Sequence, residues 1–116
     1  MKYWKVSAVL AIVMLSITAI AATPTWHNSK IRTIYPLADG RVVLTLENDS
    51  AACQNNSSPK YYYIAVGENG VTQEGLNNML SVALTAATTG REISFNFDAD
   101  SSGCQINRLS LNFQSQ

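Results

Sequence analysis

The side chains in this sequence that could do acid–base or nucleophilic chemistry are few and lie far apart. His27 is the only histidine, so a Ser-His-Asp or Cys-His arrangement would have to include it. Asp98 and Asp100 could form an acid–base pair or bind calcium. Asp-Ala-Asp-Ser-Ser-Gly is also an ordinary turn composition, however, and we favour the turn. We therefore predict that the protein is not an enzyme and holds no cofactor or metal.

Cys53 and Cys104 are the only two cysteines. In an oxidising compartment, two cysteines most simply form one disulfide, which here would close a loop of about 50 residues. A tetrahedral metal site is the alternative, but it needs about four ligands, and His27 lies far away in the sequence. We predict a Cys53–Cys104 disulfide.

Three consecutive tyrosines offer aromatic surface for binding. In a strand over residues 60–66, Tyr62 shares one face with Ile64 and Val66, while Tyr61 and Tyr63 share the other. One interpretation is ordinary, with half of the strand in the core and half on the surface. The other makes Tyr61 and Tyr63 a stacking platform for sugar rings or bases, with Trp26 as a second ligand-binding candidate.

The charge of the chain separates these two kinds of ligand. Without Lys2 and Lys5, six basic residues stand against eight acidic ones, and none of the basic residues cluster. Phosphate neutralisation supplies much of the affinity for nucleic acid, so we expect no nucleic-acid partner. A glycan suits the tyrosines better.

The first 21 residues have the order of parts of a secretory signal peptide. Two lysines precede an apolar run, and Ala19-Ile20-Ala21 gives the small-x-small pattern of a cleavage point. A membrane anchor is the alternative, but a run of about 15 residues is shorter than the ~20 that a spanning helix needs. We predict cleavage after Ala21, a secreted or periplasmic location, and no stable membrane insertion afterwards.

The remaining sequence predicts one domain with the element order β-β-β-α-β-β. Residues 22–29 are predicted to be an irregular lead-in, and residues 30–116 the domain. Strands are expected at residues 30–35, 41–47, 60–66, 91–98 and 104–113, with a bulge near residues 107–108 where the apolar positions change phase. This is the order of the OB-fold, a five-stranded barrel whose helix lies between strands three and four. An open α+β sheet is the alternative.

The helix predicted at residues 71–90 is the organising element of this order. Thr72 is its expected N-cap and Gly90 its expected C-terminal glycine. A buried stripe is expected at Leu76, Met79, Leu80, Ala83, Leu84 and Ala87. The other arc is uncharged and would suit either packing between copies of the chain or a helix cradled by loops. If copies of the chain pack there, the predicted oligomer interface consists of Asn77, Asn78, Ser81, Thr85 and Thr88.

The segment from Gly75 to Leu84, followed by Thr88-Thr89-Gly90-Arg91-Glu92-Ile93-Ser94-Phe95 and flanked by the two cysteines, resembles one part of a known family. It is similar to the helix-to-strand segment of subtilase-cytotoxin-type B subunits. Those are exported OB-fold proteins that assemble as pentamers and bind host glycans. The resemblance implies a glycan or receptor partner and a homo-oligomer, as in a toxin B subunit.

Taken together, the sequence favours an exported, non-enzymatic module that binds a glycan or receptor. The alternative is a structural or protein-interaction protein of the periplasm or cell surface, which would use the same barrel to hold a protein partner.

Overall fold

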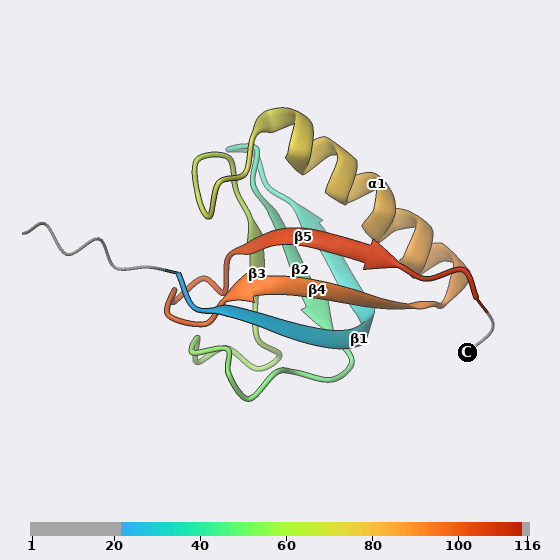
Figure 1. The fold of residues 1–116 in the computed structure, drawn as a ribbon, viewed down its shortest axis with the longest axis horizontal. Helices are drawn as coiled ribbons and strands as arrows, with labels where there is room; N and C mark the ends of the chain where they lie inside the picture. The colour runs from blue at the N-terminus through green and yellow to red at the C-terminus, as the bar shows by residue number, and fades with distance from the viewer. Residues whose placement is uncertain (1–21, 115–116) are drawn as a thin grey trace, which may run out of the picture.

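The computed structural model describes residues 22–114 as a five-stranded antiparallel sheet with one helix (Figure 1). The predicted order of elements is confirmed. The predicted signal peptide, residues 1–21, lies outside the described residues. The elements in chain order are β1 (Pro24–Pro36), β2 (Val42–Leu46), β3 (Tyr62–Ile64), α1 (Gln73–Thr89), β4 (Glu92–Asp98) and β5 (Ile106–Leu111).

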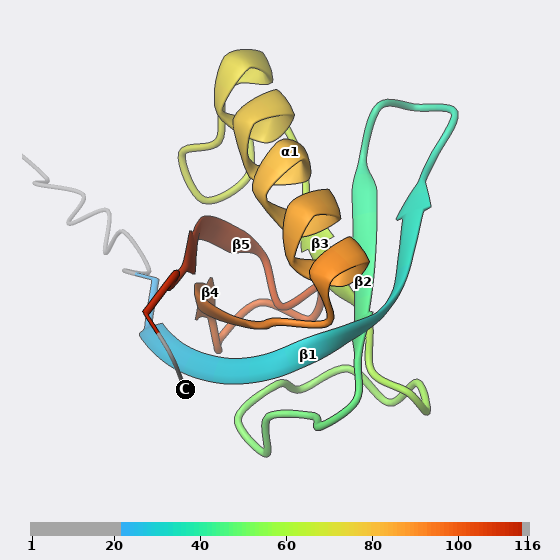
Figure 2. The ribbon, with the colours of Figure 1, turned by 90° about the vertical axis from the view of Figure 1, so that its right-hand side faces the viewer.

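The strand order in the sheet is β3-β2-β1-β4-β5, and β1 connects its two halves. The first part of β1, Pro24 to Lys30, pairs with β4, and the part from Ile31 onward pairs with β2. The register shifts between Ile31 and Thr33, and such a bulge bends a strand. Figure 2 shows β1 curving along the whole sheet.

The two outer strands of this sheet approach each other. The backbone N–H of Tyr63 in β3 donates to the carbonyl of Gly103, just before β5, at 3.1 Å. The curved sheet is thereby closed into the predicted OB-fold-like barrel, which is confirmed.

The lead-in predicted at residues 22–29 is wrong, because β1 already begins at Pro24. This stretch lacks an apolar alternation, since Ser29 is its only buried residue. Its hydrogen bonds come from β4, which lies about 70 residues later in the chain and is invisible to local sequence patterns.

The phase change in the last strand has the predicted cause. Arg108 lies opposite Asn96, but Ile106 lies opposite the next residue of β4, Phe97, so Asn107 is an extra residue in β5. This bulge lets both Ile106 and Leu109 pack against the core.

An aromatic cluster fills the barrel. Tyr62, Phe95 and Phe97 are fully buried, and Tyr62 meets the two phenylalanines edge to face, with centroid distances of 5.3 and 5.7 Å. Helix α1 packs its buried side against this core and contacts β1 and β5.

The ends of α1 are as predicted. The Thr72 hydroxyl accepts from the Gly75 N–H at 3.0 Å, and Gly90 adopts a left-handed φ of 67° at the C-terminus. The buried stripe is narrower than predicted. Leu84 is 50% exposed and Ala87 is exposed, whereas Ala86 is buried. Buried positions at residues 76, 79, 83 and 86 form a thin seam, because the small barrel offers the helix only a narrow contact.

The predicted disulfide is confirmed. Cys53 and Cys104 are bonded, with their Cα atoms 5.6 Å apart, and both are buried. The bond ties the loop before β3 to the segment before β5. No helix in the described part of the chain combines the length and apolarity that a membrane span requires.

Candidate ligand-binding site

The tyrosines of β3 divide between the two faces of the barrel wall as predicted. Tyr62 points into the core, where its hydroxyl accepts from the Ser50 N–H at 2.8 Å and donates to Asp49 Oδ1 at 3.2 Å. Burial raises the pKa of the Tyr62 hydroxyl to about 12. Tyr61 is 40% exposed and Tyr63 is half-buried, and both line cavities on the outer face.

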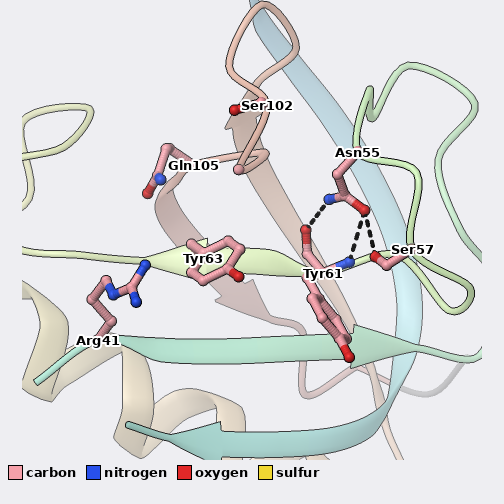
Figure 3. A pocket seen from close by; sticks show the side chains of 8 residues that line it. Arg41, Asn55, Ser57, Tyr61, Tyr63, Ser102 and Gln105 are labelled. Atoms are coloured by element: carbon pink, nitrogen blue, oxygen red, sulfur yellow. Dashed lines mark hydrogen bonds between the residues drawn. The ribbon is translucent and has the colours of Figure 1, made fainter. Parts of the chain in front are cut away.

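The first of these cavities has a volume of about 370 Å³ and a largely polar lining (Figure 3). Its walls come from four places in the chain: the start of β2, the loop before β3, β3 itself and the β4–β5 connection. The lining residues are Arg41, Asn55, Ser57, Tyr61, Tyr63, Ser102, Gly103 and Gln105. This is the face of strands 2 and 3, with the loop between strands 4 and 5, at which OB-folds bind oligonucleotides and oligosaccharides.

Asn55 fixes the backbone of Tyr61. Its Nδ2 donates to the Tyr61 carbonyl, and its Oδ1 accepts from the Tyr61 N–H at 3.2 Å (Figure 3). Oδ1 also accepts from the Ser57 hydroxyl at 2.6 Å. The amide of Asn55 is therefore engaged in positioning Tyr61 and is not a free ligand contact.

Arg41 is the charged side chain of this cavity. Its Nε donates to Asp39 Oδ2 at 2.8 Å, and its guanidinium lies over the Tyr63 ring, 5.2 Å from the centroid. The Arg41 N–H, with the guanidinium beside it, lowers the pKa of the Asp39 carboxyl. The positive charge of Arg41 is thus already paired with Asp39. The cavity therefore attracts a polyanion such as a nucleic acid only weakly.

Gln105 brings an unpaired acceptor to the same cavity. Its Oε1 is buried and has no hydrogen-bond partner among the described residues. A buried carbonyl without a partner is unfavourable, so a hydroxyl or N–H group of a ligand or water that reached it would be stabilised. A Cβ at Gly103 beside it would lie 2.6 Å from Gln105 Nε2 and 3.3 Å from the Tyr63 ring, so a side chain there would displace the Gln105 amide.

A second cavity, of about 250 Å³, lies on the other side of the two tyrosines. Tyr35, Leu37 and Val43 complete its lining, which is mostly apolar. The rings of Tyr35 and Tyr61 meet edge to face at 6.5 Å. In the sequence, Tyr35, Leu37 and Val43 have only the features of ordinary strand and turn residues, and nothing local marks them as parts of a site.

Trp26, the other predicted ligand-binding residue, is not brought together with the tyrosines. It is 55% exposed on β1 and lines neither of their cavities. It forms a row across β1, β4 and β5 with Asn96 and Arg108. The Arg108 guanidinium lies over the Trp26 ring at 5.8 Å, and the row leaves Asn96 only 3% exposed.

The residues considered for catalysis make structural hydrogen bonds. Asp98 Oδ1 accepts from the N–H groups of Thr23 and Asp100. The bond from Asp100 is typical of a turn, and the bond from Thr23 connects this turn to the residue before β1. Asp100 accepts from the Thr23 hydroxyl. His27 Nε2 lies 2.7 Å from the carbonyl of Asn48. Within residues 22–114, no three His, Cys, Asp or Glu side chains are grouped as metal ligands would be.

The residues assigned to an oligomer interface all lie exposed on the outer side of α1. Several of their hydroxyls are used inside the helix, since Ser81 and Thr85 donate to the carbonyls of Asn77 and Ser81 at 3.0 and 2.9 Å. The face is therefore uncharged and composed of small side chains, with Leu84 exposed beside it.

Comparison of the chain with protein-family models, with curated proteins and with solved structures gives no match.

Proposed function

We propose that this chain is an exported, non-enzymatic module that binds a glycan in the cavity beside Tyr61 and Tyr63. The observation that carries the proposal is the placement of Tyr61 and Tyr63 beside a cavity also lined by Arg41, Ser102 and Gln105, on the OB-fold face that commonly binds oligosaccharides. Aromatic faces stack on the apolar faces of sugar rings, while amide and guanidinium groups hydrogen-bond to ring hydroxyls.

The charge of the cavity favours a sugar over a nucleic acid. Among the described residues, Arg41 is the only charged one that lines this cavity, and its Nε lies 2.8 Å from Asp39 Oδ2, which neutralises it. Nucleic-acid sites normally neutralise several phosphates with separate cations. A ligand recognised by stacking and neutral hydrogen bonds fits this lining better.

The test is a glycan array with the oxidised protein from Ala22 onward, followed by titration of the best glycan. Tyr61→Ala and Tyr63→Ala should each weaken binding by about fivefold or more, because stacking on one aromatic ring contributes about 1–3 kcal/mol. Tyr63→Phe should retain most of the affinity, since it keeps the ring.

Trp26→Ala is the matched control, because Trp26 is an exposed aromatic residue outside the cavity. It should bind like the parent protein. An array without any bound glycan, or tyrosine variants that bind like the parent while Trp26→Ala loses binding, would contradict the proposed site.

A protein partner is the second candidate function, and one observation favours it. An apolar cavity of about 240 Å³ lies between α1 and β5, lined by residues that include Val82, Leu109 and Leu111, with Phe113 73% exposed at its edge. Exposed apolar surface of this kind suits protein contacts. A co-purified partner released by Phe113→Asn, together with an empty glycan array, would support this alternative.

A further inference from the structure

The two cavities on the outer face are adjoining halves of one site. They share Tyr61 and Tyr63, which are the two lining residues common to both among residues 22–114. The tyrosine rings stand between a polar side and an apolar side. A ligand that covers both faces of these rings therefore meets two different environments.

The apolar side is built into the register of the sheet. Val43 in β2 lies directly between Tyr35 in β1 and Tyr63 in β3, so the three side chains form one row on the outer face. Although it points away from the core, Val43 is only 4% exposed. Leu37, at the turn after β1, completes the apolar wall.

The polar side presents groups that a sugar can use. The side chain of Gln105 lines this cavity, and the guanidinium of Arg41 lies 5.2 Å from the centroid of the Tyr63 ring. Figure 3 shows the side chains of Arg41 and Gln105 near the same side of the Tyr63 ring, away from Tyr61. Ser102 adds a hydroxyl from the β4–β5 connection.

A plain oligosaccharide would fill only the polar side. Water in the other cavity would remain against Tyr35, Leu37 and Val43, and displacing it with apolar atoms is favourable at about 25 cal/mol per Å². The combined volume of the cavities lies in the range of sites for small organic ligands.

We propose that the preferred ligand is an amphiphilic glycan, a sugar that carries an alkyl or acyl chain. The sugar occupies the cavity of Arg41 and Gln105, and the chain crosses the tyrosines into the cavity of Leu37 and Val43. This inference rests on the proposed function and adds the chemical class of the ligand.

The experiment compares methyl and n-octyl β-D-glycosides of glucose, galactose and N-acetylglucosamine by NMR titration of the oxidised protein, below micelle-forming concentrations. For at least one sugar, the octyl glycoside should bind about tenfold more tightly or better, which requires burial of only about two methylene groups. Leu37→Asn should abolish this gain and leave the methyl glycoside unaffected. Val43→Thr keeps the side-chain shape and should reduce the advantage of the octyl over the methyl glycoside. This variant replaces Leu37→Asn in the test if Leu37→Asn folds poorly.

Phe113→Asn is the control for unspecific binding of the alkyl chain, because it makes the same kind of change at the separate apolar cavity beside α1. It should leave the octyl gain intact. Equal affinity of methyl and octyl glycosides would overturn this inference alone, with glycan binding preserved. Equal binding of 1-octanol and all octyl glycosides would overturn both the inference and the proposed function.

Discussion

The side-chain amide of Asn55 pairs with the backbone of Tyr61 as a neighbouring strand would. It donates to the Tyr61 carbonyl and accepts from the Tyr61 N–H, while its Nδ2 lies 3.3 Å from the Sγ of Cys53. One side chain therefore connects the disulfide to the aromatic site. Because β3 is only three residues long, Asn55 supplies the hydrogen bonds that hold the chain just before this strand.

Asn55→Asp should weaken both stability and ligand binding. The change replaces the Nδ2 donor with an oxygen that faces the Tyr61 carbonyl, and a lost hydrogen bond with an unsatisfied group costs about 1–3 kcal/mol. Denaturant unfolding and glycan titration measure the two effects. Asn56→Asp makes the same change at an exposed neighbour and should behave like the parent, so equal losses in both variants would assign the effect to added charge.

Removal of the disulfide should destabilise the domain by about 4 kcal/mol, because the bond closes a loop with a sequence separation of 51. The Cys53→Ala/Cys104→Ala double variant, studied by denaturant unfolding, measures this. Its tyrosine resonances should also broaden, since Asn55 loses its anchored neighbour. A variant with parental stability and sharp Tyr61 signals would contradict the role given to the bond.

Alkaline pH should unfold the protein through Tyr62. Its pKa is raised from 10.0 to about 12 by burial, so the folded state disfavours the phenolate. The resulting stability is complete below about pH 10 and is lost as the pH rises towards about 12, a change of about 3 kcal/mol.

Denaturant unfolding at a series of alkaline pH values checks this prediction. Tyr62→Phe should be less stable at neutral pH, because the Ser50 N–H loses its acceptor, but its stability should fall less steeply with pH. Parallel pH profiles for the two proteins would show that another group causes the alkaline loss.

Gly103→Ala should impair the site more than the fold. A Cβ at this position would push the Gln105 amide and crowd the Tyr63 ring, both of which line the polar cavity. We expect a loss of glycan affinity of about tenfold, with a stability change of about 1 kcal/mol. Ser102→Ala, at the exposed neighbouring position, is the control for the stability change. If Gly103→Ala bound the glycan as tightly as the parent protein, ligand binding would not depend on the space beside Gly103.

Self-association through the outer face of α1 stays a prediction that one substitution can test. If copies pack there, Thr85→Lys should lower the sedimentation coefficient, because a buried lysine without a partner is strongly unfavourable. Asn56→Lys is the exposed control. A parent protein that sediments as a monomer at high concentration would refute the assignment.

The sequence was informative where the signal is local. Thr72 and Gly90 set the ends of α1, and the phase change between Ile106 and Leu109 located the bulge, because capping and alternation depend on nearby residues. The position of Tyr62 in the core followed from strand alternation in the same way.

The missed features depend on distant partners. The stretch from Pro24 to Ser29 is a strand only because β4 pairs with it. Arg41, Asn55 and Gln105 reach one cavity because the closed barrel brings three separate loops together. Nothing in the local sequence around these three residues distinguishes them from other polar loop residues. The contact between α1 and the barrel is narrow, and leaves Leu84 exposed, because the barrel is small.

The division of β1 between two partners also constrains how the chain folds. During synthesis this strand is the first to emerge, and β2 can join its later half soon afterwards, but its earlier half pairs with residues up to Asp98. Contacts so distant in sequence form slowly. The earlier half of β1 must therefore stay unpaired until β4 has been made, although its later half is already paired with β2.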